Sequence, residues 1–188
     1  MQNKKTAVID TETNWDDKVM SVGVAIAEIN TWKLTDKKYY IITPECSAGG
    51  MYSSVMEMPN ITVDLKGRRS AVMSDLINTL RSENIDSVFA YNANFDFKHM
   101  PELASFTWYD IMKLAAYKQY NHSIPECADC CGTGRLKRNY GVESIMHMLT
   151  DSCRYREVHN ALCDAVDELK IMRLLGHDFD VYKIARIN

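Results

Sequence analysis

The sequence has 188 residues, 46% of them hydrophobic, which suits one domain over residues 1–188 with a buried core. Its formal net charge of −3 gives no bulk attraction to nucleic acid, which disfavours a protein that coats nucleic acid through charge alone. No stretch approaches the roughly 20 apolar residues of a membrane helix, and no apolar signal segment follows the first residues, so we expect a cytoplasmic protein.

The first third of the chain predicts three strands joined by short connections. They cover 6–10, 19–29 and 38–43. All three are apolar or β-branched runs, as strands are. A loop rich in Gly, Ser and Met follows, from 44 to 67, and Ser70 is then a plausible N-cap for a helix that runs to Leu80.

The rest of the chain predicts one short strand among helices. We expect a strand at 87–90 and helices at 93–100, 111–115, 141–149 and 161–175. Pro101 ends the first of these helices, Asp110 caps the second, and 122–134 is loop. Leading strands followed by strands mixed with helices favour an α/β fold with a mixed central sheet flanked by helices.

Acidic residues gather at the ends of two predicted strands. Asp10 and Glu12 are two residues apart, so both side chains lie on one face of the strand, where their mutual repulsion favours a bound Mg²⁺ or Mn²⁺. Asp96 follows the strand at 87–90, and the carboxyl ends of central strands are where α/β sheets place their sites. Taken alone, Asp10 and Glu12 are more simply interpreted as solvated acids at a strand end, and Asp96 as a helix cap.

His159 and Asp164 are five residues apart, which is about 140° on a helix, so both cannot point the same way from one regular helix. We therefore expect His159 in the loop before the helix and Asp164 inside it. Asp167 and Glu168 are close enough to be confused with Asp164, and only the spacing from His159 favours Asp164.

Three blocks of sequence together resemble the motifs of the DEDDh exonucleases, the family of the DNA polymerase III epsilon subunit, RNase T and oligoribonuclease. They are VIDTET at 8–13, YNANFD at 91–96 and HNALCDA at 159–165. The blocks occur in the family's order, and the third fits the His-x-Ala-x-x-Asp pattern at every fixed position. The resemblance implies a ribonuclease H-like fold and 3′-to-5′ exonuclease activity.

The resemblance also implies a mechanism. Asp10, Glu12, Asp96 and Asp164 would hold two Mg²⁺ or Mn²⁺ ions, and His159 would take the proton from the attacking water. The substrate would be single-stranded nucleic acid with a free 3′ end, with DNA favoured, and the products nucleoside 5′-monophosphates. Several relatives are dimers, so a homodimer is compatible with it.

The residues beside the motifs are candidates for substrate binding: Thr13, Trp15 and Asn92. Relatives often continue the first motif with Thr-Gly, whereas Asn14 and Trp15 follow Thr13 here. Trp15 could stack on a base or pack as an ordinary aromatic residue. Basic residues cluster at 66–69, 135–138 and 154–156, and any of these clusters could be ordinary surface or could contact a phosphate backbone.

The cysteines offer a second metal hypothesis. Cys127 and Cys130 form a Cys-x-x-Cys pair, which can supply half of a structural Zn²⁺ site, with His122, Cys131 or Cys153 as further ligands. No second such pair is present, so reduced, free thiols are the simpler interpretation.

Three other functions are compatible with part of the pattern. The first is an oligoribonuclease-like enzyme that acts on short RNA, and the second is a non-catalytic nucleic-acid-binding relative. The third is an endonuclease with a ribonuclease H-like fold. The presence of all four acids and His159 disfavours the second, and the spacing of His159 from Asp164 disfavours the third.

Overall fold

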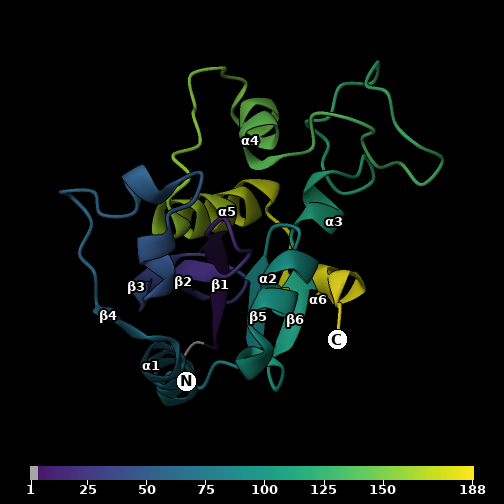
Figure 1. Ribbon diagram of the computed structural model, residues 1–188. Helices are drawn as coiled ribbons and strands as arrows, with labels where there is room; N and C mark the ends of the chain where they lie inside the picture. Colours follow the sequence, from purple (N-terminus) through teal and green to yellow (C-terminus); the bar gives the residue numbers. More distant parts are fainter. Residues whose placement is uncertain (1–3) are drawn as a thin grey trace.

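A six-stranded mixed sheet with helices on both faces forms the centre of the computed structural model, which describes residues 4–188 (Figure 1). The strands are β1 (Lys5–Thr13), β2 (Val19–Glu28), β3 (Leu34–Thr43), β4 (Leu65–Arg68), β5 (Ser87–Ala90) and β6 (Thr107–Asp110). Their order is β4-β3-β2-β1-β5-β6. β2 is antiparallel to both β1 and β3, and the other pairs are parallel. The predicted α/β architecture is thus confirmed.

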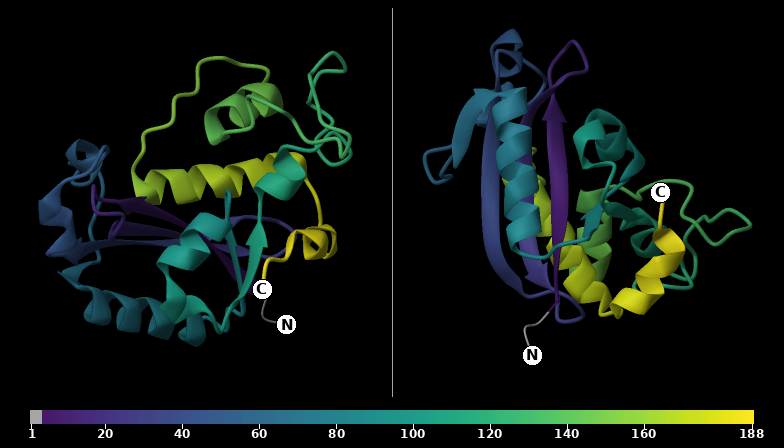
Figure 2. Two further views of the ribbon diagram at one scale, coloured as in Figure 1. Left: turned by 45° about the vertical axis from the view of Figure 1, so that its right-hand side comes forward. Right: turned by 90° about the horizontal axis from the view of Figure 1, so that it is seen from below.

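The helices lie on the two faces of this sheet. They are α1 (Arg69–Ser82), α2 (Asn94–His99), α3 (Met112–Ala115), α4 (Val142–Thr150), α5 (Ala161–Leu175) and α6 (Phe179–Tyr182). Figure 2 shows α1 on one side of the sheet and α5, with α4 beyond it, on the other. Within the described residues, no helix is both long and apolar enough to cross a membrane.

Alternate residues of β1 pack into two separate cores. Ile9 points to the α1 side and packs with Leu76, whereas Val8 points to the α5 side and packs with Ala165 and Leu169. The period of two in an extended strand gives both faces an apolar surface. Asp10 and Glu12 share the α5 side with Val8, as their spacing predicts.

A glycine lets α5 approach the sheet closely at this point. Gly23 of β2 pairs with Asp10, and a Cβ atom added to it would lie 2.0 Å from the carbonyl oxygen of Ala161, the first residue of α5. No side chain fits in that space, so glycine is needed for the first turn of α5 to lie against the sheet beside Asp10.

Three short elements do not follow from the sequence pattern: β4, β6 and α6. Each has four residues, too few for a period to be recognised, and none has the continuous apolar run that marks the equally short β5. The expected cap Ser70 lies inside α1, because β4 pairs with β3 as far as Arg68 and the chain turns into the helix directly after it.

Asp110 has a different position from the one expected. It is the last residue of β6, and α3 begins at Met112. Its carboxylate still accepts the backbone N–H of Met112, at 3.0 Å, and also accepts the N–H of Asn92, at 3.0 Å. Asp110 therefore connects, through these two hydrogen bonds, the turn after β5 with the turn after the neighbouring parallel strand β6.

The longest connection runs between α3 and α4, over residues 116–141, and protrudes from the body of the molecule (Figure 1). Isolated bridges between Tyr117 and Arg135 and between Cys130 and Leu136 hold its two sides together. The predicted loop at 122–134 lies within it.

Candidate active site

The first two candidate ligands lie at the carboxyl end of the central strand β1. Asp10 and Glu12 point to the side of the sheet covered by α5, and a bulge follows between Glu12 and Thr13. The Oδ2 atom of Asp10 is buried and has no hydrogen-bond partner. A buried carboxylate oxygen without a donor is costly unless a cation or a proton compensates it.

Asp96 reaches the same place from the neighbouring strand. β5 is parallel to β1, and the chain turns after it at Tyr91 and Asn92 into α2, which carries Asp96. Asp96 is only 3% exposed, and the hydroxyl of Thr11 donates a hydrogen bond to its Oδ1, at 2.7 Å. Thr11 lies between Asp10 and Glu12, so this bond ties α2 to β1.

His159 and Asp164 are placed by the start of α5. His159 precedes the helix with a left-handed backbone (φ 58°), and Asp164 lies in the first turn, 3% exposed. The two positions agree with the prediction from their spacing. Between them, the side chain of Asn160 accepts the N–H groups of Leu162 (3.1 Å) and Cys163 (3.3 Å) and so caps the helix.

These segments bring three potential metal ligands together. Single ligand atoms of Glu12, His159 and Asp164 all lie within 4.8 Å of one another, and no other such group of three or more occurs among residues 4–188. The Oδ1 atom of Asp164 is buried without a partner, like the Oδ2 atom of Asp10. A carboxylate-rich set with open oxygens fits a hard divalent cation such as Mg²⁺ or Mn²⁺.

The acidic groups at this site repel one another when they are ionised. Burial, and then the charge of Asp164, raises the pKa of Glu12 to about 8. Burial, and then the charge of Glu157, raises the pKa of Asp164 to about 8. Both carboxyl groups therefore resist ionisation at neutral pH unless a cation is bound beside them.

The other two acids show the same effect. Burial raises the pKa of Asp96 to about 7, although the hydrogen bond from Thr11 acts in the opposite direction. Burial, and then the charge of Glu168, raises the pKa of Asp10 well above its ordinary value. The site thus gathers acidic groups that ionise fully at neutral pH only when a bound cation compensates their charge.

Tyr52 is a member of the site that the sequence gave no reason to select. Its ring stacks on the imidazole of His159, with centroids 4.0 Å apart and an angle of 13° between the planes. It comes from the loop between β3 and β4, where only composition is recognisable. The amide of Asn160 donates to the carbonyl of Val55, at 2.9 Å, and so fastens this loop to the start of α5.

Glu168 is the second residue missed. It lies on α5 one turn beyond Asp164, is 2% exposed, and accepts the backbone N–H of Tyr91 at 3.0 Å. Residues three and four apart on a helix share a face, so the position of Asp164 made both Asp167 and Glu168 candidates, and the structure buries Glu168.

The predicted substrate-binding residues lie at or just after the carboxyl ends of β1 and β5. Thr13 ends β1, Asn92 is exposed in the turn after β5, and Trp15 is 69% exposed, so it does not pack in the core. Asn14, between Thr13 and Trp15 in the chain, is buried. Its side-chain oxygen accepts hydrogen bonds from the N–H groups of Asp16 and Lys18, both at 3.0 Å. Asn14 therefore holds the turn that presents Trp15.

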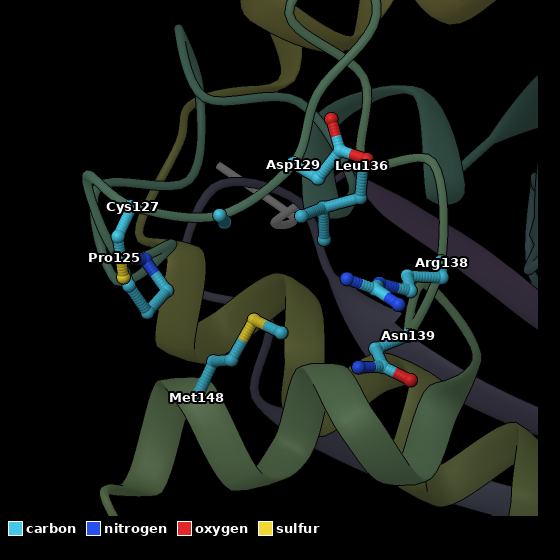
Figure 3. A pocket seen from close by; sticks show the side chains of 8 residues that line it. Pro125, Cys127, Asp129, Leu136, Arg138, Asn139 and Met148 are labelled. Atoms are coloured by element: carbon cyan, nitrogen blue, oxygen red, sulfur yellow. The ribbon is translucent and has the colours of Figure 1, made fainter.

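The cysteine pair of the zinc hypothesis, Cys127 and Cys130, lies with Cys131 in the connection between α3 and α4. Cys127 lines a pocket of about 270 Å³ with Arg138, Asn139 and Met148, as Figure 3 shows. In the described chain, the cysteines and His122 do not come together as three potential metal ligands. The structure therefore provides no geometric support for the zinc hypothesis.

Comparison with known proteins gave matches only by structure. No protein-family model and no curated protein matches the sequence. One similar structure is a 3′-exonuclease that recognises the 3′ end of the histone mRNA stem-loop, with a TM-score of 0.65 and 14% identity, over 93% of this chain and 64% of that one. The present chain thus spans less than two thirds of that protein.

Two further structures match over nearly their whole length. The nuclease domain of 3′hExo, a DEDDh family member bound to rAMP, has a TM-score of 0.63 and 14% identity, over 92% of this chain and 91% of that one. Exonuclease X, in complex with 5′-overhanging duplex DNA, has a TM-score of 0.52 and 18% identity, over 90% of each chain. At these identities the likeness establishes the fold: the ribonuclease H-like fold of the DEDDh exonucleases, as the three motifs predict.

Proposed function

We propose that this chain is a metal-dependent 3′-to-5′ exonuclease that releases nucleoside 5′-monophosphates from single-stranded nucleic acid. DNA is the favoured substrate, and short RNA is the alternative. The observation that carries the proposal is the convergence of Glu12, His159 and Asp164 to within 4.8 Å, next to buried carboxylate oxygens that have no protein partner.

Asp10, Glu12, Asp96 and Asp164 would hold two Mg²⁺ or Mn²⁺ ions. When bound, such ions lower the pKa of an attacking water and stabilise the leaving 3′-oxygen. The protein contributes the positions of the four acids, which come from β1, α2 and α5. These elements are packed against one another, so the ligand set is preorganised.

His159 would accept the proton of the attacking water. A histidine suits proton transfer near neutral pH, and the imidazole lies beside Glu12 and Asp164, where that water would be activated. The stacked ring of Tyr52 restricts the rotation of the imidazole and excludes solvent from one of its faces. His159 can therefore act at a fixed point without being part of a regular helix.

Trp15, Thr13 and Asn92 would contact the terminal nucleotides. The exposed Trp15 ring is available for stacking on a base, and such stacking tolerates any sequence. The phosphate backbone of the nucleic acid would follow the basic segment 135–138. This segment is followed closely by Tyr140, whose carbonyl accepts a hydrogen bond from the hydroxyl of Tyr91, in the turn that leads to Asp96. The exonucleases of similar fold recognise an RNA stem-loop or bind duplex DNA, which supports nucleic acid as the substrate class.

A digestion experiment tests the proposal. Single-stranded DNA, duplex DNA and RNA, each labelled at the 5′ end, are incubated with the protein and Mg²⁺, with and without EDTA. We expect ladders that shorten by one nucleotide at a time, fastest for single-stranded DNA, and no cleavage with EDTA. Faster digestion of short RNA would replace the DNA assignment, whereas internal fragments or an inert protein would contradict an exonuclease. Asp164→Asn serves as the inactive control for contaminating nucleases.

A further inference from the structure

The pocket between the connection of residues 116–141 and α4 has no role in the reaction proposed above. Its volume of about 270 Å³ is just below the roughly 300–1,000 Å³ of pockets for drug-sized ligands, so it suits one small group. Leu136 and Met148 reach into it from opposite sides, and the guanidinium of Arg138 points into it from a third (Figure 3). Apolar walls with a hydrogen-bonding group at their edge are the surroundings in which proteins hold an unstacked base.

The wall that carries Leu136 is fixed by backbone hydrogen bonds. Leu136 is 2% exposed, forms a bridge with Cys130, and donates its N–H to the carbonyl of Ala116 at 2.9 Å. The N–H of the next residue, Lys137, donates to the carbonyl of Asp129 at 3.0 Å. The two sides of the connection are thus paired next to the pocket, so its shape does not depend on a ligand.

Arg138 differs from the other basic residues of the same connection. Those side chains contact groups of the protein itself: Lys118 the carbonyl of Glu126, Arg135 the ring of Tyr140, and Lys137 the carboxylate of Asp129. Within residues 4–188, no ion pair involves Arg138, although its guanidinium points into the pocket. The pocket therefore presents a set of N–H donors to whatever enters it.

These donors match one class of base. Both purines carry the acceptor N7, which pyrimidines lack, and guanine adds O6 beside it, where an arginine donates two hydrogen bonds. Asn139 lines the pocket next to Arg138, and an asparagine can accept from the amino group of adenine while it donates to N7. Leu136 and Met148 would cover the two faces of the flat ring.

The pocket is also close in the chain to the candidate active site. Tyr140 follows Arg138 by two residues, which span at most about 7 Å. Its carbonyl accepts the hydroxyl of Tyr91, in the turn that leads to Asp96. A strand whose 3′ end lies at the acids can therefore continue past this contact toward the pocket.

We propose that this pocket binds a purine base of the substrate strand, upstream of the nucleotide that is removed, with Leu136 and Met148 on its faces and Arg138 at its N7 edge. The inference rests on the proposed function in that the ligand is the nucleic-acid substrate. It divides the basic segment 135–138 into one residue that recognises a base and others that are left to contact phosphates. The enzyme then prefers certain sequences, although hydrolysis at the acids does not require any.

The test measures binding and not cleavage. The strands are single-stranded dT oligonucleotides with one dG, dA or dC placed at successive positions from the 3′ end, and an all-dT strand. Phosphorothioate linkages protect their 3′ ends from digestion, and a 5′ dye reports binding by fluorescence anisotropy with Mg²⁺ present. Arg138→Gln removes the guanidinium at an exposed position. Lys137→Gln is the matched control, because it removes the same charge from the adjacent residue, which pairs with Asp129.

We expect the wild type to bind strands with dG or dA at one particular position about 10-fold more tightly than the all-dT strand, within the range of one well-placed base contact. Strands with dC should bind like all-dT. Arg138→Gln should bind all strands within about 2-fold of one another. Lys137→Gln should keep the purine preference and weaken all strands alike, because a phosphate contact carries no sequence information. Unchanged thermal unfolding shows that both variants are folded.

Three results would overturn the inference. The first is the absence of a purine preference at every position in the wild type, and the second is a preference that survives in Arg138→Gln. The third is equal weakening of all strands by Arg138→Gln, since Arg138 would then contact a phosphate. Any of these, together with normal digestion ladders, would leave the proposed function standing. A purine preference in a protein that digests nothing would support the pocket and contradict the exonuclease.

Discussion

The candidate site has two halves with different construction. The acidic half, Asp10, Glu12, Asp96 and Asp164, is carried by strands and helices that pack in the core. The loop half, His159 and Tyr52, is carried by a residue of left-handed backbone before α5 and by the irregular connection between β3 and β4. The difference indicates that the positions of the proposed ligands are fixed by the fold as a whole, whereas the position of the proposed base depends on a few local contacts.

One residue joins the halves. Asn160 caps α5, which carries Asp164, and its amide also donates to the carbonyl of Val55 near Tyr52. Local contacts of this kind open at a lower free energy than the core does. Substitutions in the acidic half should therefore change metal binding, and those in the loop half should change turnover while metal binding is kept.

The largest effect is expected in the acidic half. Asp10→Asn should reduce kcat by roughly 10⁴-fold, because it would remove one of the four proposed ligands and with it several kcal/mol of the transition-state stabilisation that bound ions supply. Mn²⁺ binding, measured by calorimetry, should fall with it. A variant that lost turnover but kept full metal affinity would contradict the assignment of Asp10 as a ligand.

His159→Ala tests the loop half at its centre. It should lower kcat by roughly 10³-fold, within the range that a general base contributes, while Mn²⁺ affinity and substrate KM stay close to the wild type. The exposed His122 is the matched control, and His122→Ala should retain full activity. Wild-type turnover in His159→Ala would mean that the base lies elsewhere.

The acidic half should also make the stability of the metal-free protein depend on pH. The pKa values of Glu12 and Asp164 are raised to about 8 and that of Asp96 to about 7, so in the folded state these groups hold their protons up to these values. In the unfolded chain they lose them near pH 4. The folded state then binds more protons between about pH 4 and pH 8, and stability falls as pH rises through that window.

Thermal unfolding in EDTA between pH 5 and pH 8.5 measures this effect. We expect a fall of roughly 5–10 °C, which corresponds to a few kcal/mol in a protein of this size. Saturating Mg²⁺ should remove most of the fall, and Asp164→Asn should reduce it without metal. A flat or rising profile in EDTA would show that the acids do not repel one another as the structure implies.

A smaller effect is expected at the substrate-binding rim. Trp15→Ala should raise KM for a single-stranded substrate by roughly 10-fold, since stacking on a base contributes about 1–3 kcal/mol, and should leave kcat nearly unchanged. Ile184, an apolar residue in the turn that follows α6, is 56% exposed and provides the control through Ile184→Ala. Equal KM values in both variants would remove Trp15 from the substrate-binding surface.

The sequence predicts the elements that have strong local patterns, but not the contacts between distant segments. The strand at 87–90 and the helix at 161–175 have the predicted bounds, because long or strongly apolar patterns report burial directly. The spacing of His159 and Asp164 also places one before the helix and the other within it, since 3.6 residues per turn leaves no alternative.

Tyr52, Gly23 and Glu168 depend on contacts between distant segments, which no local pattern encodes. Tyr52 meets His159 across 107 positions of the chain, so only the folded loop brings the rings together. Gly23 is needed because α5 crosses β2 at that residue, which depends on the packing of the whole sheet. Glu168 was within reach of helical spacing, but Asp164 had to be accepted as inward-facing first.

Tyr52 gives the smallest and most specific test of the two halves. Tyr52→Ala removes the ring that stacks on His159, and an aromatic pair contributes about 0.5–1.5 kcal/mol, so kcat should fall by roughly 3- to 10-fold. Tyr52→Phe keeps the ring and should restore kcat. Met51, 66% exposed in the same loop, is the control, and Met51→Ala should change neither kcat nor KM. If Tyr52→Phe were as slow as Tyr52→Ala, the hydroxyl and not the stack would be responsible. If Tyr52→Ala weakened Mn²⁺ binding instead, the loop half would extend into the metal site, and the two halves could no longer be treated as separate.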